Sequence, residues 1–327
     1  LPEGAIQGTF REFITVTLRK DWAVAGRTFA AGAFLAMPWD RFLAGGRDFA
    51  VLFEPGRRKS LADTTLTRSH LIVNELENVR SRLYLHTPRD GKWTRTPIDT
   101  PDFGNVSAMA VAHESDDYFL NFTDYLTPTS LYLVSSGRPG RELLKQLPAF
   151  FNAAGLAVAQ HEAVSKDGTR IPYFQVSRQG LKLDGTAPTL LYGYGGFEIA
   201  ETPGYRAGVG SAWLERGGVY VVANIRGGGE FGPTWHQAAL KEKRQRAYND
   251  FIAIAEALIA RRVTSPRHLG IMGGSNGGLL VGAVFTQRPE LFGAVVCQVP
   301  LLDMQRYNKQ SAYMNTLAYA FLLKQLR

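Results

Sequence analysis

The chain has 327 residues, 45% of them hydrophobic and 20% charged, which is ordinary for a globular protein with room for two domains. Its formal net charge is +8, but the basic residues are scattered along the chain. The densest basic cluster, residues 241–246, contains a glutamate and no aromatic residue, so we interpret it as a solvated surface segment and exclude a nucleic-acid partner.

The first 150 or so residues are predicted to be all-β. Short segments rich in β-forming residues recur here, and turn sequences such as Glu54-Pro55-Gly56 and Arg89-Asp90-Gly91 separate them. The strand candidates are residues 10–18, 49–53, 71–73, 81–85, 118–122 and 130–134. Many short strands joined by turns favour a sandwich, a barrel or propeller blades, and no clean repeat decides among these three.

From about residue 151 the pattern changes to strands that alternate with helices. Asp167-Gly168 predicts a hairpin turn, and Asn249 is a candidate N-cap for a helix with apolar residues at helical spacing. The later strand candidates are residues 189–192, 219–225, 269–273 and 292–299. Such continuous apolar strands indicate a mostly parallel sheet with both faces covered, and they predict a ligand site at the carboxyl ends of the strands.

The sequence Gly273-Gly274-Ser275-Asn276-Gly277-Gly278 lies between one of these strands and an apolar helix. A serine at this place, with glycine two residues away on each side, fits the Gly-x-Ser-x-Gly turn that presents a nucleophile. We expect glycine at 273 and 277 because side chains there would collide with neighbouring backbone. The helix also points its free N–H groups and positive dipole end at the serine. Ser275 is therefore the candidate nucleophile, and a merely structural glycine turn is the alternative.

Acyl transfer also needs hydrogen-bond donors for the oxyanion that forms during attack. In this fold one donor is the backbone N–H of the residue after the nucleophile, here Asn276, and a second comes from the loop after an earlier strand. The glycine-rich residues 193–197 directly follow the strand candidate at 189–192, so we expect them to form that loop. The alternative interpretation is a flexible turn with a packed tyrosine.

Residues 191–197 (LYGYGGF), 223–232 (ANIRGGGEFG) and 273–278 (GGSNGG) together resemble the prolyl oligopeptidase family of serine peptidases. Residues 166–172 and 287–293 extend the resemblance, which covers about 160 to 309. The resemblance implies a β-propeller that caps an α/β-hydrolase domain, with no cofactor. It also implies hydrolysis of short peptides after proline.

The same resemblance assigns roles to individual residues. It implies that Ser275 is the nucleophile and that the Asn276 backbone N–H and the Tyr194 hydroxyl form the oxyanion hole. Phe197 would line the pocket for the residue before the scissile bond. Residues 226–229, Trp235 and His236 are expected to be structural.

The chain departs from the family where the rest of the triad belongs. In this fold the triad runs serine, then Asp or Glu, then His, yet no histidine follows Ser275. The acids after it are Glu290 and Asp303, and Asp303 matches a family position that is not catalytic. We therefore expect a fragment of a longer peptidase, lacking the family's N-terminal part and its C-terminal Asp and His region. Alone it should be nearly inactive.

We expect two domains, a partial β-propeller of about three blades at residues 1–150 and a truncated α/β-hydrolase domain at 151–327. A non-catalytic peptide-binding relic of the scaffold and an esterase of the same fold are the alternatives. The six histidines are dispersed, which argues against a metal site, and no apolar run reaches about 18 residues, which argues against a membrane span. We expect a full-length monomer, and the compartment stays open between cytoplasm and periplasm.

Overall fold

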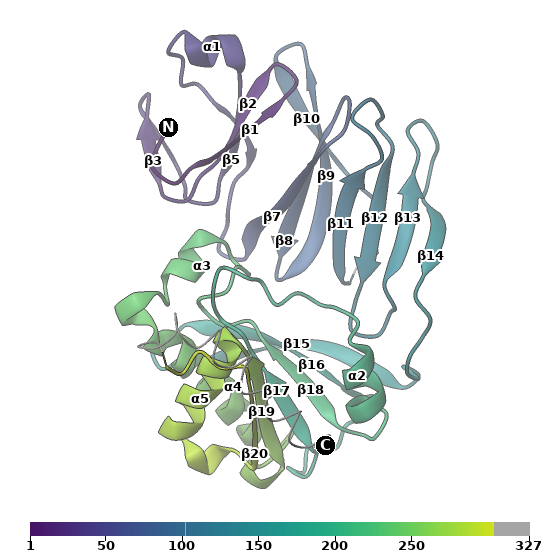
Figure 1. Cartoon of the computed structure of the whole chain (residues 1–327), viewed down its shortest axis with the longest axis vertical. Helices are drawn as coiled ribbons and strands as arrows, with labels where there is room; N and C mark the ends of the chain where they lie inside the picture. The colour runs from purple at the N-terminus through teal and green to yellow at the C-terminus, as the bar shows by residue number, and fades with distance from the viewer. Residues whose placement is uncertain (102, 304–327) are drawn as a thin grey trace, which may run out of the picture.

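Three four-stranded antiparallel sheets follow one another in the N-terminal part of the chain (Figure 1). The computed structural model describes residues 1–101 and 103–303. The sheets consist of β1 (Ile6–Phe10), β2 (Phe13–Thr17), β5 (Phe34–Pro38) and β6 (Ala50–Phe53); β7 (Lys59–Leu66), β8 (Leu71–Glu77), β9 (Arg80–Arg89) and β10 (Lys92–Pro97); and β11 (Asn105–Ala110), β12 (Tyr118–Thr123), β13 (Ser130–Val134) and β14 (Glu142–Gln146). Separate four-stranded sheets in succession are the blades of a propeller rather than the wall of a closed barrel.

The first sheet differs from the sequence expectation in one respect. The predicted single strand at residues 10–18 is a hairpin, because β1 ends at Phe10 and β2 begins at Phe13. Arg11 makes the turn with a φ of 52°, a left-handed conformation that no glycine or asparagine signals in the sequence. A small hairpin, β3 (Trp22–Val24) and β4 (Arg27–Phe29), and the short helix α1 (Trp39–Leu43) complete this region.

A six-stranded sheet with the order β15-β16-β18-β17-β19-β20 forms the second part of the molecule. Its strands are β15 (Leu156–Val164), β16 (Arg170–Arg178), β17 (Thr189–Tyr192), β18 (Val219–Ala223), β19 (Leu269–Gly274) and β20 (Ala294–Gln298). The last four strands pair in parallel, and β16 pairs antiparallel with β18. The mostly parallel sheet is therefore confirmed, with an antiparallel hairpin at one edge.

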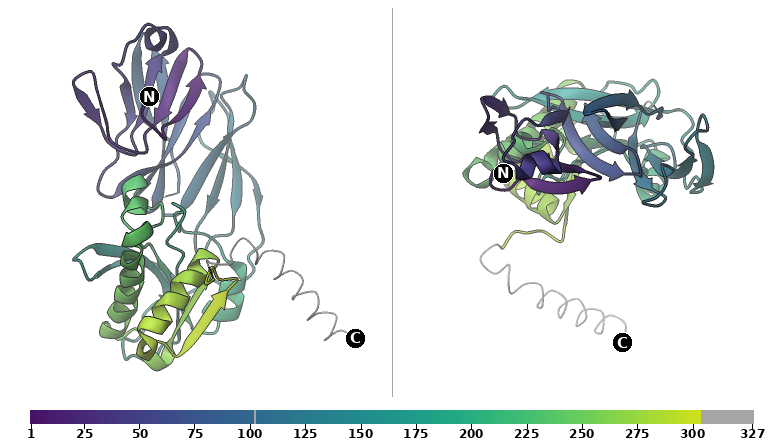
Figure 2. Two further views of the ribbon diagram at one scale, coloured as in Figure 1. Left: turned by 60° about the vertical axis from the view of Figure 1, so that its left-hand side comes forward. Right: turned by 90° about the horizontal axis from the view of Figure 1, so that it is seen from above.

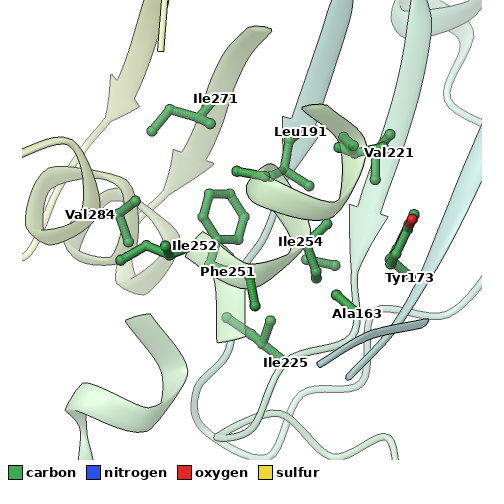
Figure 3. Close-up of a cluster of buried hydrophobic side chains, with 14 of the residues drawn as sticks. Ala163, Tyr173, Leu191, Val221, Ile225, Phe251, Ile252, Ile254, Ile271 and Val284 are labelled. Carbon is green, nitrogen blue, oxygen red and sulfur yellow. The ribbon is translucent and has the colours of Figure 1, made fainter. Parts of the chain in front are cut away.

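Helices cover both faces of this sheet. The helices are α2 (Ala207–Val209), which continues as a π-helical turn over Gly210–Leu214, α3 (Pro233–Gln237), α4 (Gln245–Ala260) and α5 (Asn276–Gln287). Phe251 and Ile254 of α4 pack with Val284 of α5 against Leu191 and Ile271 of the sheet (Figure 3). Asn249 is not the N-cap of α4, because the helix already begins at Gln245 and buries Ala247.

The three blades and the hydrolase sheet lie at opposite ends of the molecule, as Figure 1 and the left view of Figure 2 show. Loops at the carboxyl ends of the parallel strands meet the blades. Ser60 of β7 donates to the Glu230 carbonyl at 2.9 Å, and the Asn105 amide donates to the Thr202 hydroxyl at 3.0 Å. Within the described residues, no helix is long and apolar enough to cross a membrane.

Candidate active site

Ser275 occupies a strained turn between β19 and α5. Its φ of 54° and ψ of −116° lie in a region that residues other than glycine rarely adopt. The backbone hydrogen bonds of the turn hold this conformation, because the Ser275 N–H donates to the Gln298 carbonyl at 3.0 Å and the Ser275 carbonyl accepts from the Leu279 N–H at 3.1 Å. A sharp strand-to-helix turn of this kind presents the nucleophile in the α/β-hydrolase fold.

Backbone crowding explains the two glycines that flank the serine. A Cβ on Gly273 would lie 2.2 Å from the Gly277 carbonyl oxygen, and a Cβ on Gly277 would lie 2.6 Å from the Gly193 carbonyl oxygen. Both distances are far shorter than any van der Waals contact. The expectation that side chains at these positions would collide with backbone is therefore confirmed.

Asn276 ties the serine turn to the loop that follows β17. Its side-chain amide, in a residue only 6% exposed, donates to the Tyr194 carbonyl at 2.7 Å. The Gly193 N–H also donates to the Met272 carbonyl at 3.4 Å. The structure thus brings Ser275, Asn276 and Tyr194 together at the carboxyl ends of β17 and β19.

Arg244 supports the same loop from the segment before α4. One guanidinium nitrogen donates to the Asn276 side-chain oxygen at 3.2 Å, and another donates to the Gly195 carbonyl. The interpretation of residues 241–246 as an entirely solvated segment is therefore wrong at Arg244, which is half-buried, although its neighbours in the cluster are exposed. No pattern near Arg244 could reveal this role, since its partners lie 32 and 49 residues away.

Phe197 and Glu198 form the outer end of the loop, both with positive φ, at 53° and 57°. Phe197 is 67% exposed, so its ring is available to a ligand. His236 Nδ1 lies 2.7 Å from the Gly227 carbonyl, which also accepts from the Glu198 N–H at 3.3 Å, and the Glu198 nitrogen lies 3.1 Å from the same ring nitrogen. His236 therefore braces the loop, in line with the structural role expected for it.

A cavity of about 620 Å³ lies between the blades and this loop. Its walls include Thr64 and Asn74 of the second blade, and Glu198 and Thr202 of the hydrolase part. Asn74 is 6% exposed, and its side-chain oxygen is buried without a hydrogen-bond partner among the described residues. In the described chain, none of the four predicted site residues belongs to the cavity wall.

The described residues supply no base for Ser275. None of them makes a hydrogen bond with its hydroxyl, and the described histidines have other surroundings. His161 contacts Arg261 at 3.3 Å, and burial lowers the pKa of His86 to about 4. Within these residues no group of three or more His, Cys, Asp or Glu side chains is placed to hold a metal ion.

A buried ion-pair network lies behind the site. The Arg226 guanidinium, in a residue 4% exposed, donates to Asp250 at 2.6 and 2.9 Å and to Asp167 at 2.5 Å. The hydrogen bond from Arg226 holds the pKa of Asp167 well below its usual range. Arg226 thus joins the β15–β16 hairpin to α4, as expected of a structural residue.

Glu230 is a buried ionisable residue that sequence reasoning missed. It is 1% exposed, and burial raises its pKa to about 8. One carboxyl oxygen accepts from the Glu201 N–H at 3.0 Å, while the other has no partner among the described residues. Its place inside a glycine-rich loop gave no sign of burial.

Comparisons with known proteins agree on one family. A family model described as "Prolyl oligopeptidase family" matches residues 208–324, and one described as "Prolyl oligopeptidase, N-terminal beta-propeller domain" matches residues 45–147. The second match confirms the propeller among the folds expected for the N-terminal part, and the hydrolase prediction is likewise confirmed.

Individual relatives are similar over most of this chain. A Sinorhizobium fredii protein named "Uncharacterized peptidase y4nA" is 45% identical over 95% of this chain and 44% of its own length. The prolyl endopeptidase of Elizabethkingia meningoseptica is 40% identical over 68% of this chain and 32% of its own. A solved structure titled as a post-proline cleaving enzyme from Rickettsia typhi has a TM-score of 0.87 and 37% identity, covering 94% of this chain and 45% of that one. The chain therefore spans less than half the length of these relatives.

Proposed function

Because the chain belongs to the prolyl oligopeptidase family, we propose that it carries the nucleophile and oxyanion-binding groups of a serine peptidase that hydrolyses short peptides. The observation that supports this most is the backbone of Ser275. Its φ of 54° and ψ of −116° place the serine in a strained turn between a strand and a helix N-terminus. This is the arrangement that presents a nucleophile in the α/β-hydrolase fold.

The reaction would proceed through an acyl-enzyme. The Ser275 Oγ attacks the peptide carbonyl carbon as its proton passes to a base, and the carbonyl oxygen becomes an oxyanion. The Asn276 N–H and the Tyr194 hydroxyl donate to that oxyanion. The C–N bond breaks as the leaving amine takes the proton, and water then releases the acyl group from the serine.

Proline before the scissile bond is the preference that we propose. The relatives named above as a prolyl endopeptidase and a post-proline cleaving enzyme support it. Phe197 is an aromatic ring at 67% exposure on the loop that also carries Tyr194, so the compact apolar ring of proline would pack against its face. A hydrolysis assay that compares peptides with proline and alanine before the cleaved bond tests this preference.

The 327-residue chain by itself is proposed to be nearly inactive. No histidine follows Ser275 in the sequence, and no described residue bonds its hydroxyl. Loss of the base in a serine protease costs roughly 10⁶ in kcat and leaves about 10³–10⁴ over water from binding and the oxyanion hole.

Labelling with a fluorophosphonate probe tests the nucleophile and the inactivity together. We expect slow labelling that Ser275→Ala abolishes. Rapid stoichiometric labelling would show that a base is present after all. Labelling that Ser275→Ala leaves unchanged would reject Ser275 as the nucleophile.

A non-catalytic peptide-binding role is the second candidate, because the base is not among the described residues. Calorimetric titration with a proline-containing tetrapeptide separates the two. Because a peptidase chain without its base would also bind the peptide without hydrolysis, the titration is read beside the fluorophosphonate labelling. Peptide binding together with no labelling that depends on Ser275 favours the binding protein. A simple ester hydrolysed in preference to the peptide would favour the esterase.

A further inference from the structure

The loop end at Phe197 and Glu198 is held in a conformation that it would not adopt alone. Two consecutive residues other than glycine have φ of 53° and 57°. Such residues cost free energy, and they persist only where surrounding contacts fix them. The contacts of Glu198 therefore decide the shape of the loop that carries Tyr194 and Phe197.

The hydrolase part supplies the backbone contacts. The Glu198 N–H donates to the Gly227 carbonyl at 3.3 Å, and the Ile199 N–H donates to the Gly196 carbonyl at 3.0 Å. Gly229 lies so close that a Cβ there would be 2.1 Å from the Glu198 carbonyl oxygen. None of these contacts uses the carboxylate of Glu198, whose partner is Arg19 of the first blade.

The first blade supplies the side-chain contact. Arg19, just after β2, donates from both terminal nitrogens to the two carboxylate oxygens of Glu198, one of them at 2.8 Å. The two residues are 179 positions apart. The Arg19 side chain is 34% exposed and that of Glu198 is 18% exposed, so solvent screens the pair only in part.

A second contact fixes Arg19 on the hydrolase part. The Gln237 side chain of α3 donates to the Arg19 carbonyl at 3.0 Å. Gln237 directly follows His236, whose Nδ1 lies 2.7 Å from the Gly227 carbonyl and 3.1 Å from the Glu198 nitrogen. Arg19, Glu198 and the end of α3 thus form one closed set of contacts across the boundary between blade and hydrolase. A two-pronged, half-buried arginine–carboxylate pair fixes direction as well as distance.

We propose that Arg19 is a positioning residue for the substrate loop: its pair with Glu198 makes the shape of residues 194–198 depend on contact with the first blade. When the blade moves away, the carboxylate loses its partner and the loop can leave its left-handed conformation. Tyr194 and Phe197 then lose the placement that the loop gives them. The inference rests on the proposed function for its meaning, but the coupling between Arg19 and the loop can be measured without any catalytic activity.

Hydrogen exchange measured by mass spectrometry on the 327-residue chain tests the pair without any need for activity. We expect Arg19→Ala to speed amide exchange in residues 197–199 by about tenfold, because the loop loses a charge-assisted contact. Exchange in β17 and β19 should not change. Arg41→Ala is the matched control, since it removes an exposed ion pair with Asp48 in the same N-terminal region.

Swapping the two charges shows whether the change in amide exchange comes from the pair of Arg19 and Glu198. Arg19→Glu and Glu198→Arg should each speed loop exchange, since each places like charges face to face. The double variant Arg19→Glu with Glu198→Arg should recover at least part of the protection. Arg19→Lys should give an intermediate rate, because it keeps the charge but cannot make the two-pronged contact.

Two results would overturn the inference. One is unchanged loop exchange in Arg19→Ala, and the other is a double variant no better protected than either single reversal. If the Arg19→Ala chain does not fold, the loop exchange rates of Arg19→Lys and of the double variant still test the inference. Failure of the proposed function would show separately, as fluorophosphonate labelling that does not depend on Ser275.

Discussion

The Asn276 side-chain amide donates to the Tyr194 carbonyl across 2.7 Å, and the same amide group accepts from Arg244 at 3.2 Å. The residue whose backbone N–H is proposed for the oxyanion hole therefore also holds, through its side chain, the loop proposed to supply the second donor. Its burial, at 6% exposure, keeps water from competing for either contact.

We predict that Asn276→Ala lowers the free energy of unfolding by about 1–3 kcal/mol, because it leaves the Tyr194 carbonyl and the Arg244 guanidinium without this partner. Urea unfolding measures the change. Asn121→Ala, at an exposed position on β12, is the control and should stay within about 0.5 kcal/mol of the unaltered chain. Asn276→Asp keeps the acceptor for Arg244 but loses the donor to Tyr194. Its free energy of unfolding should therefore lie between those of Asn276→Ala and Asn121→Ala. Equal midpoints for Asn276→Ala and Asn121→Ala would contradict the bracing role.

Neighbouring glycines in the serine turn allow a sharper comparison. A Cβ at Gly273 would lie 2.2 Å from a carbonyl oxygen, whereas the nearest atom to a Cβ at Gly274 is 3.8 Å away. We predict that Gly273→Ala destabilises the chain by about 3 kcal/mol or more, since backbone must move, and that Gly274→Ala is tolerated. Thermal unfolding of the two variants decides. A Gly274→Ala variant as unstable as Gly273→Ala would show that crowding is not the reason for glycine at 273.

Features of the site that depend on neighbours in sequence could be predicted from the sequence. The turn around Ser275 requires small residues two positions away on each side, and the sequence has Gly273 and Gly277 there. The loop after β17 could be placed because parallel strands bring their carboxyl ends to one edge of the sheet.

Features that depend on distant partners could not be predicted. The sequence places Arg244 in a basic segment that looks exposed. Its contact with the loop after β17 exists only once the chain has folded. The sequence suggests that Glu230 is a loop carboxylate, and only the fold buries it and brings Ser60 of the second blade to its backbone carbonyl. The hairpin at Arg11 carries no glycine, so only the pairing of β1 with β2 reveals it.

The buried pair of Arg226 and Asp250 gives a prediction about stability. Asp250 is fully buried and contacts Arg226 at 2.6 Å, while Glu256 on the same helix makes an exposed pair with Arg288 at 2.7 Å. We predict that Asp250→Ala costs about 3 kcal/mol, because the buried Arg226 guanidinium loses its buried partner and keeps only the partly exposed Asp167 as a counter-charge. Glu256→Ala should cost at most about 1 kcal/mol. Chemical denaturation of both variants checks this, and similar losses for the two would mean that burial does not set the strength of the pair.

Glu230 should make the stability of the chain depend on pH. Burial raises its pKa from 4.5 to about 8, so between these values the folded chain holds a proton that the unfolded chain has released. The stabilising contribution of this proton is complete below about pH 4.5 and is lost as the pH rises toward 8. Burial also raises the pKa of Glu201, which adds a dependence of the same sign.

We predict that Glu230→Gln, which is neutral at every pH, flattens this dependence without removing the part that Glu201 contributes. Above about pH 8 the variant should be more stable than the unaltered chain, by at most about 5 kcal/mol at roughly 1.4 kcal/mol per pKa unit. Denaturant unfolding at intervals from pH 5 to about pH 9 measures the difference curve. Glu142→Gln, at an exposed position on β14, controls for the change in net charge. Parallel curves for Glu230→Gln and the unaltered chain would mean that the Glu230 carboxyl stays ionised in the folded state, with its second oxygen solvated or paired.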